Sequence, residues 1–174
     1  MALPGIESKR LLLVPFSLQM VEAALDRDSE IWHTLSIRPH DEWPGEDIKE
    51  ELPLFAQALG KDPTRAEWGR IIIHAAHRMI IGDIGFQEPP DANGTVEMGY
   101  SIVPSHRKRG YATEAGRAII AWAFSRPEVG RVTANCLQDN HASIRVLEKL
   151  GMKRMGMEDG MLKWEIGRNS WSNL

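Results

Sequence analysis

Four consecutive basic or titratable side chains, His106 to Arg109, stand directly before Gly110 and a segment with helical periodicity. The mostly apolar run 96–103 that precedes them predicts a strand. A helix that begins after such a turn presents unpaired backbone N–H groups and the positive end of its dipole to the turn. The strand, the basic turn and the helix together predict a site for a small anionic ligand such as a pyrophosphate.

Other interpretations of this turn are possible from composition alone. A run of charges such as Lys108 and Arg109 is commonly a solvated surface. A P-loop is excluded because no Gly-Lys-Ser/Thr follows at the required spacing, and a dinucleotide-binding turn is excluded because the glycines do not fall as Gly-x-Gly-x-x-Gly. The flanking strand and helix favour the anion site over the solvated surface.

The spacing Arg107-x-x-Gly110-x-Ala112 resembles the acyl-CoA loop of the GCN5-related N-acetyltransferases, which is written Gln/Arg-x-x-Gly-x-Gly/Ala. Three further segments are similar to successive signatures of the RimJ/RimL-type branch of that family, which acetylates ribosomal-protein N-termini: 110–115, 140–143 and 146–151. The resemblance is sharp over roughly residues 94 to 157 and only architectural before them. Ala112 stands where the last motif glycine often lies, a departure that the family pattern allows.

The resemblance implies an α+β acyl-CoA N-acyltransferase fold. Its central sheet is mixed and mostly antiparallel, has about seven strands with helices on both faces, and splays between the fourth and fifth strands, here 95–103 and 131–137. A splay leaves backbone N–H and C=O groups unpaired, and an extended pantetheine arm can satisfy them as an added strand does.

The resemblance also implies the cofactor contacts, with acetyl-CoA as co-substrate. Ile102 and Val103 are expected to contact the pantetheine arm, and Asn140 to bind the same arm, although a helix cap is an ordinary role for an asparagine there. The diphosphate is expected on the residues of the loop and the first helical turn, Arg107, Lys108, Arg109, Gly110, Tyr111, Ala112 and Thr113. A Cβ at Gly110 would crowd a phosphate that approaches the main chain.

Catalysis requires a neutral amine, a polarised thioester carbonyl and a way to stabilise the departing thiolate. The resemblance implies that Ser143 lies near the sulfur as a proton donor and that Glu97 deprotonates the amine through water. Glu97 is equally consistent with a surface residue or an arginine partner. His74 and His77 are reserve bases. Cys136, inside an apolar strand, is expected to be inert core.

The acceptor side is predicted less sharply. Trp32, His33 and Trp43 lie in the acidic segment 28–50, which forms one wall of the acceptor cleft in this family, and aromatic side chains beside carboxylates suit a cationic amine. Both tryptophans are equally consistent with core positions. Because an α-amine with a pKa near 8 is partly neutral at pH 7, whereas a lysine near 10.4 is not, a weakly equipped site favours α-amines.

Composition limits the remaining function classes. The chain has 174 residues, a formal net charge of −3 and a pI near 6.1, which argues against a nucleic-acid module. One cysteine excludes an intrachain disulfide and a Cys-rich metal site, and no His, Asp and Glu cluster has metal-ligand spacing, so no metal is expected. No membrane or secretory segment is recognised, and we expect a cytoplasmic monomer or homodimer.

Periodicity and turn residues place the elements in one domain, 1–168, with a loose C-terminal tail, 169–174. Helices are expected at 18–25, 46–59, 112–125 and 141–150, the second split or kinked at Pro53. Strands are expected at 10–14, 68–76, 79–86, 95–103 and 131–137, followed by a hairpin of 152–157 with 161–166.

The sequence therefore predicts an acetyl-CoA-dependent N-acetyltransferase that transfers its acetyl group directly to a primary amine, with a protein or peptide N-terminus as the expected acceptor. Two alternatives stay open. The acceptor can instead be a small amine, polyamine, amino acid or antibiotic, or the chain can be an acyl-CoA-binding sensor without turnover.

Overall fold

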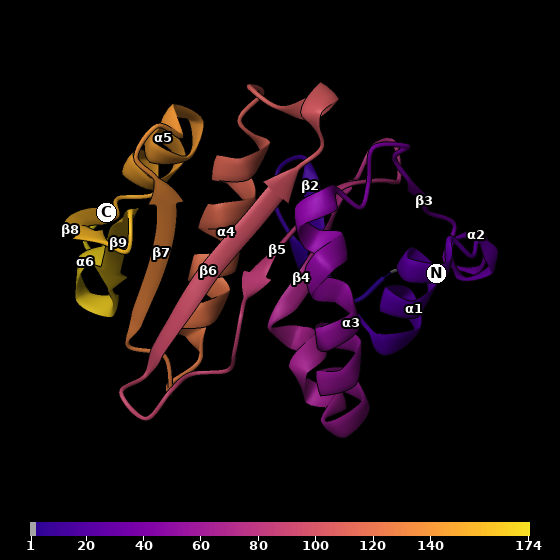
Figure 1. Cartoon of the computed structure of the whole chain (residues 1–174), viewed down its shortest axis with the longest axis horizontal. Coiled ribbons are helices and arrows are strands. Elements are labelled where there is room, and N and C mark those ends of the chain that lie inside the picture. Colours follow the sequence, from indigo (N-terminus) through magenta and orange to yellow (C-terminus); the bar gives the residue numbers. More distant parts are fainter. Residues whose placement is uncertain (1–2) are drawn as a thin grey trace.

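The computed structural model describes residues 3–174 and is built around one sheet (Figure 1). The strand order is β1-β2-β4-β5-β6-β7-β9-β8, and β3 pairs with β5. The strands are β1 (Ile6–Glu7), β2 (Leu11–Pro15), β3 (Arg38–Pro39), β4 (Gly69–His74), β5 (Met79–Phe86), β6 (Thr95–Ile102), β7 (Arg131–Leu137), β8 (Lys153–Glu158) and β9 (Met161–Gly167). Most neighbours are antiparallel, and β6 and β7 are parallel, so the expected mixed α+β sheet is confirmed.

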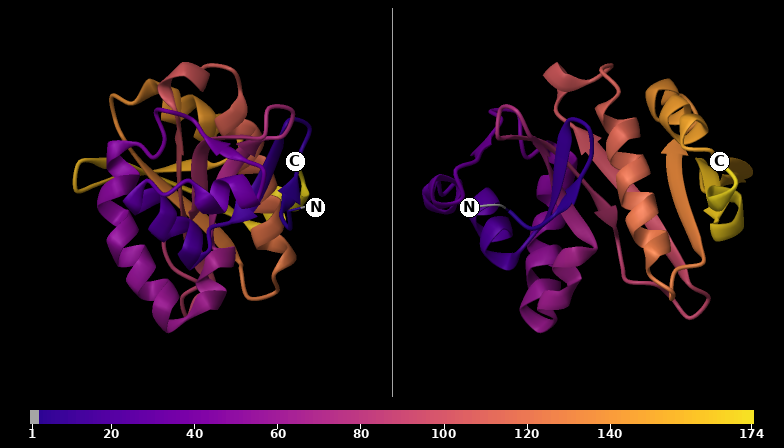
Figure 2. Two further views of the ribbon diagram at one scale, coloured as in Figure 1. Left: turned by 90° about the vertical axis from the view of Figure 1, so that its right-hand side faces the viewer. Right: turned by 180° about the vertical axis from the view of Figure 1, so that it is seen from behind.

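Helices cover both faces of this sheet (Figures 1 and 2). The long helix α4 lies behind β6 in Figure 1 and α3 lies in front of the sheet, with α1 packed beside α3. The helices are α1 (Leu18–Asp26), α2 (Glu30–Thr34), α3 (Glu46–Lys61), α4 (Tyr111–Ser125), α5 (His141–Lys149) and α6 (Arg168–Ser172), with short 3₁₀ turns at Pro63–Glu67 and Pro104–His106.

Within residues 3–174 the sheet has nine strands, where about seven were expected. The two additional strands, β1 and β3, contain two residues each. Such short pairings have no alternating pattern of their own, because a period of two residues needs several residues to show. They exist because neighbouring strands already supply a ladder to pair with.

The parallel ladder between β6 and β7 ends early. Its pairs run from Thr95 with Arg131 to Met98 with Ala134, and the rest of the two strands diverge. The expected splay therefore lies between these strands, at their carboxyl ends. The turn that leads into α4 and the first turn of α5 both lie at this open end (Figure 1).

Two local predictions were wrong. A split or kink of α3 was predicted at Pro53, and the helix is not split, because it continues from Glu46 to Lys61. Pro53 is exposed, so water can satisfy the carbonyl that loses its partner. The last residues are not a loose tail, because Arg168–Ser172 forms α6. Trp171 packs against Phe124 with ring centroids 6.2 Å apart, and the Arg168 guanidinium donates to the Arg126 carbonyl at 2.9 Å.

A buried polar pair connects the loop before α3 to the sheet. The Trp43 indole Nε1–H donates to Asp83 Oδ2 at 3.0 Å, and Asp83 is almost fully buried on β5. Burial raises the pKa of Asp83 to about 7; the Trp43 bond acts in the opposite direction, and Glu51 raises it further. A carboxyl that is neutral in the folded chain and ionised in the unfolded chain couples folding to pH.

We predict the following sign. Between the ordinary value near 3.8 and about 7, the folded chain binds the Asp83 proton and the unfolded chain does not, so the free energy of unfolding falls as pH rises. The slope from this one group is at most about 1.4 kcal/mol per pH unit. Urea unfolding from pH 4.5 to 8 should show that Asp83→Asn, which keeps the acceptor for Trp43, flattens this fall. Glu22→Gln, at an exposed position of α1, is the control. A parallel profile for Asp83→Asn contradicts the assignment.

Candidate active site

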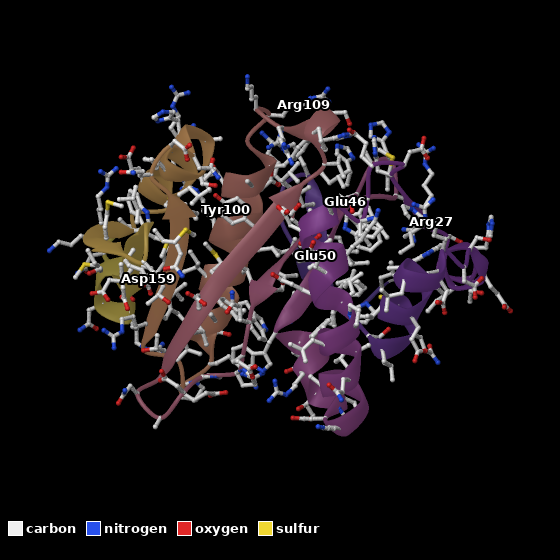
Figure 3. The ribbon with its side chains drawn as sticks, in the orientation of Figure 1. Arg27, Glu46, Glu50, Tyr100, Arg109 and Asp159 are labelled. Carbon is white, nitrogen blue, oxygen red and sulfur yellow. The ribbon has the colours of Figure 1, made fainter. Side chains whose placement is uncertain are left out.

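A cleft of about 960 Å³ lies at the open end of the β6–β7 splay (Figure 3). It is walled by the end of β6, the turn before α4, the first turn of α4 and the start of α5. The lining residues are Asp47, Tyr100, Ser101, Ile102, His106, Arg107, Lys108, Gly110, Tyr111, Ala112, Thr113, Asn140, His141, Ala142, Ser143, Arg145, Val146 and Lys149. All of the expected cofactor contacts except Val103 and Arg109 are therefore brought together.

The turn before α4 has an unusual backbone that exposes its N–H groups. Lys108 and Gly110 both have left-handed φ angles, 62° and 82°. Within residues 3–174 no side chain caps α4, whose N-cap residue is Gly110. The first-turn N–H groups of α4 are thus available to an anion in the cleft.

Arg10, from the start of the chain, fixes this turn from behind. Its guanidinium Nη1 donates to the Arg109 carbonyl at 3.0 Å, its Nε donates to Glu114 Oε2 at 2.7 Å, and it lies 4.2 Å from the Tyr111 ring centroid. Burial raises the pKa of Glu114, whereas hydrogen bonds from the Arg10 backbone, Ser8 and the Arg10 side chain lower it. The hydrogen bonds outweigh burial, so the pKa of Glu114 is below its usual value. Arg10 was not predicted as a site residue because its partners are distant in sequence.

The charges in the cleft are mostly positive. Arg107, Lys108, Arg145 and Lys149 line it, whereas Asp47 is the only carboxylate among its lining residues in the described chain. The end of β6 orients the Arg107 side chain, because Arg107 Nε donates to the Ile102 carbonyl at 2.8 Å. This field attracts a polyanionic ligand such as a diphosphate.

Asn140 and Ser143 have separate positions at the start of α5. Asn140 Oδ1 accepts a hydrogen bond from the Ser143 backbone N–H at 3.1 Å, so Asn140 is the N-cap of α5 and also lines the cleft. The Ser143 side chain is not the capping group. Ser143 lines the cleft, and its hydroxyl takes no part in capping the helix.

Glu97 lies on the opposite face of β6 from the buried Val96 and Met98, toward α3. It does not line the cleft. The Asn135 side-chain amide of β7 donates to Glu97 Oε1, which joins the two strands on this face where the ladder ends. One carboxylate oxygen is held by this bond, and the other is directed away from it.

A second polar network joins two loops beside the cleft. The Glu42 backbone N–H donates to His40 Nδ1 at 3.0 Å, so the ring proton resides on His40 Nε2, which lies 3.1 Å from Ser105 Oγ. Ser105 Oγ then has its own proton for His106 Nδ1 at 3.1 Å, and its backbone N–H donates to Glu42. This chain of bonds leaves Nε2–H of His106 as a donor.

Ser105, His40 and Glu42 are the residue types of a hydrolytic triad, but their bonds run in the wrong direction. A base must accept the serine proton at Nε2, whereas here Nε2 of His40 donates. Burial lowers the pKa of His106, and His40, Arg109 and His74 lower it further. The network therefore links the two loops and is not a hydrolytic triad.

The aromatic residues expected at the acceptor wall lie elsewhere. Trp32 and Trp43 are buried core side chains with ring centroids 6.1 Å apart, and neither lines the cleft. His33 is exposed on α2, also outside the cleft. Aromatic type alone does not distinguish a core position from a cation-binding one, which is why sequence reasoning selected them.

The reserve groups are likewise outside the cleft. His74 is buried, and its ring stacks with His77 and meets Tyr111 edge-on, at centroid distances of 4.5 and 5.6 Å. Burial lowers the pKa of His74, and His77 and Arg10 lower it further. Cys136 is buried in β7.

Among residues 3–174, no group of three or more His, Cys, Asp or Glu side chains is arranged to hold a metal ion. No helix in this part of the chain has the length and apolar character needed to cross a membrane.

Comparisons with known proteins agree with the geometry. Residues 10–153 match the acetyltransferase (GNAT) domain family. The uncharacterized N-acetyltransferase YjdG of Bacillus subtilis (strain 168) is 37% identical over 147 residues, which cover 84% of this chain and 88% of that protein.

Solved structures share the fold. The ribosomal L7/L12 alpha-N-protein acetyltransferase RimL, in its apo form, superposes with a TM-score of 0.65 at 18% identity, covering 96% of each chain. The microcin C7 self-immunity acetyltransferase MccE, in complex with acetyl-CoA and AMP, gives a TM-score of 0.63 at 16% identity over 92% of this chain and 93% of that one. With its matched domain, its similar relatives and its splayed sheet beside an uncapped helix, the chain belongs to the GNAT family of N-acetyltransferases, enzymes that use acetyl-CoA.

Proposed function

We propose that this enzyme belongs to the RimJ/RimL-like branch and transfers the acetyl group of acetyl-CoA directly to the α-amine of a protein or peptide N-terminus. The observation that carries this proposal is that the splay joins two differently charged sides. The cleft lining is mostly basic, whereas Asp47 at the start of α3 and Glu97 on β6 are acidic. Glu46 and Glu50 lie on the first turns of α3 (Figure 3), and Glu46 is paired with Lys49 at 2.8 Å.

The basic side suits the cofactor. Arg107, Lys108 and the uncapped N–H groups from Gly110 to Thr113 would bind the diphosphate. Ile102, beyond the last β6–β7 pair, would offer its backbone to the pantetheine arm, and Asn140 would bind it from α5. Val103, also expected at the arm, instead donates its N–H to the Ile81 carbonyl of β5 at 2.9 Å. A β-strand-like arm satisfies the groups that the divergence of the strands leaves open.

The acidic side suits a cationic amine. Gly45 lies beside Ser101, so the first turn of α3 borders the end of β6, where the amine has to meet the acetyl group. An α-amine needs less help to lose its proton than a lysine does, so an α-amine suits a side whose nearest groups are carboxylates. A protein α-N-acetyltransferase, RimL, is among the proteins that share the fold.

The reaction then follows as direct acyl transfer. The amine nitrogen attacks the thioester carbon and forms the C–N bond, the C–S bond breaks, and its electron pair goes to sulfur. Glu97, through a water, would take the proton that the amine loses. The Ser143 hydroxyl, free of the capping bond, would donate a hydrogen bond to the departing sulfur.

The acceptor class can be tested directly. Calorimetric titration with acetyl-CoA and with CoA should give micromolar binding, and thiol release should follow on adding peptides with free N-termini. The same peptides with a blocked N-terminus and a free lysine should release little thiol. Release with polyamines or amino acids alone would replace the peptide proposal by a small-amine acetyltransferase. Binding without release for every amine would support a sensor.

The cofactor loop can be tested with two matched glycines. We predict that Gly110→Val weakens CoA binding at least about tenfold, because its φ of 82° disfavours a branched side chain, so that the turn has to shift, and its Cβ would lie 3.4 Å from Arg10 Nη2. Gly160, in the β8–β9 hairpin, has a φ of 78° and open space around it, so Gly160→Val carries a similar backbone cost away from the cleft. Equal CoA affinities for the two variants, by calorimetry, would remove the loop from the site.

The catalytic roles can be separated from structural ones. We predict that Glu97→Gln and Ser143→Ala each lower kcat about 10- to 100-fold at unchanged CoA affinity. Ser143→Ala should leave the melting temperature unchanged because Asn140 is the cap, whereas Asn140→Ala should cost about 1 kcal/mol of stability. Glu165→Gln, on β9, which pairs with the far edge of β7, is the control for Glu97. Wild-type kcat in either catalytic variant would exclude that residue.

A further inference from the structure

Tyr100 holds a position that the proposed cofactor and catalytic contacts do not use. It follows the last β6–β7 pair, Met98 with Ala134, by two residues and therefore lies inside the splay. Its side chain is on the same face of β6 as Met98, toward α5, and lines the cleft together with Ser143. Figure 3 shows it between β6 and α5.

The Tyr100 hydroxyl is buried and has no hydrogen-bond partner among residues 3–174. A buried hydroxyl without a partner costs about 1–3 kcal/mol, which a folded chain avoids unless another molecule supplies the partner. Burial raises the pKa of Tyr100, the nearby Ser143 side chain lowers it, and Cys136 raises it. The hydroxyl therefore keeps its proton at neutral pH and acts as a donor.

The surroundings of the Tyr100 hydroxyl indicate which kind of atom can accept its hydrogen bond. Ser143 is the polar side chain that acts on the Tyr100 hydroxyl, but it completes no hydrogen bond with it among residues 3–174. The acceptor is therefore expected on a bound ligand. The diphosphate end of the cleft is at Gly110, and the strands close again at Met98. Along β6 the residues rise about 3.3 Å each, which places Tyr100 about 7 Å from that closure. Gly110 and Tyr100 line the same cleft, so an arm whose diphosphate is bound at Gly110 would extend toward Tyr100 with its acyl end.

We propose that the Tyr100 hydroxyl donates a hydrogen bond to the carbonyl oxygen of the bound thioester. Ser143 would donate to the sulfur that is bonded to the same carbonyl carbon. This assignment rests on the proposed acetyl transfer. When the amine nitrogen bonds to the carbonyl carbon, the π electron pair moves to the oxygen and the bond from Tyr100 strengthens. When the C–S bond breaks, the pair returns and the carbonyl re-forms. Tyr100 keeps its proton throughout, so it stabilises charge and does not act as an acid.

The test is Tyr100→Phe, which removes only the hydroxyl. We expect kcat to fall about 10- to 100-fold while the melting temperature of the free protein stays equal or rises, because an unpartnered buried group has been deleted. If the Tyr100 hydroxyl has only a structural role, Tyr100→Phe should lower the melting temperature and leave kcat unchanged. Tyr111→Phe, at the other tyrosine of the chain and the diphosphate end of the cleft, is the comparison and should change CoA and acetyl-CoA affinities alike.

A readout without turnover separates this inference from the proposed function. By calorimetry, Tyr100→Phe should weaken acetyl-CoA binding more than CoA binding, because CoA has no carbonyl at this point. If the wild type binds acetyl-CoA but transfers to no amine, this selective loss still supports the assignment while the transferase proposal fails. If the wild type transfers and Tyr100→Phe has wild-type kcat and an unchanged affinity ratio, the Tyr100 assignment is wrong and the function stands.

Discussion

The end of the parallel ladder between β6 and β7, at Met98 and Ala134, is the constraint on which the rest of the site depends. Before that pair the two strands satisfy each other, and after it their backbone groups need another partner. α5 fills part of the opening on one face, and Asn135 with Glu97 closes its floor on the other. What remains is a slot whose unpaired edges fit an extended, amide-bearing molecule.

The two faces of this slot differ because different parts of the chain cover them. The face of α4 and α5 contributes cations, hydroxyls and a helix terminus without a side-chain cap in the described structure, all of which favour negative charge. The face of α3 contributes carboxylates. Under the proposed function, a donor that carries phosphates and an acceptor that carries an ammonium group would meet one carbonyl carbon from opposite sides. The sheet would then separate two reactants of opposite charge.

The sequence was sufficient for features that depend on local order. The strand, turn and helix around Gly110 could be predicted because each has its own periodicity or turn residue, and so could the parallel β6–β7 pair, since a helix connects the two strands. The two-residue strands and the ordered α6 could not, because their stability comes from neighbours. Trp171, for example, is held by Phe124.

The site residues that sequence reasoning missed share long separations. Arg10 and Glu114 are 104 positions apart, and Ser105 and His40 are 65 apart, so no local pattern relates them. Trp43 shows the converse error. Its type suggested an acceptor contact, yet its partner is Asp83, a carboxyl that nothing in the sequence marks as buried.

The chain of bonds from Glu42 through His40 and Ser105 to His106 connects the loop before α3 with the loop before α4. The first loop borders the acidic side and the second borders the basic side, so order gained in one is transmitted to the other. If one substrate orders either loop when it binds, the other substrate would lose less conformational entropy when it binds in turn. Because such coupling is reciprocal, the two substrates of this enzyme would bind with positive cooperativity, whichever of them arrives first.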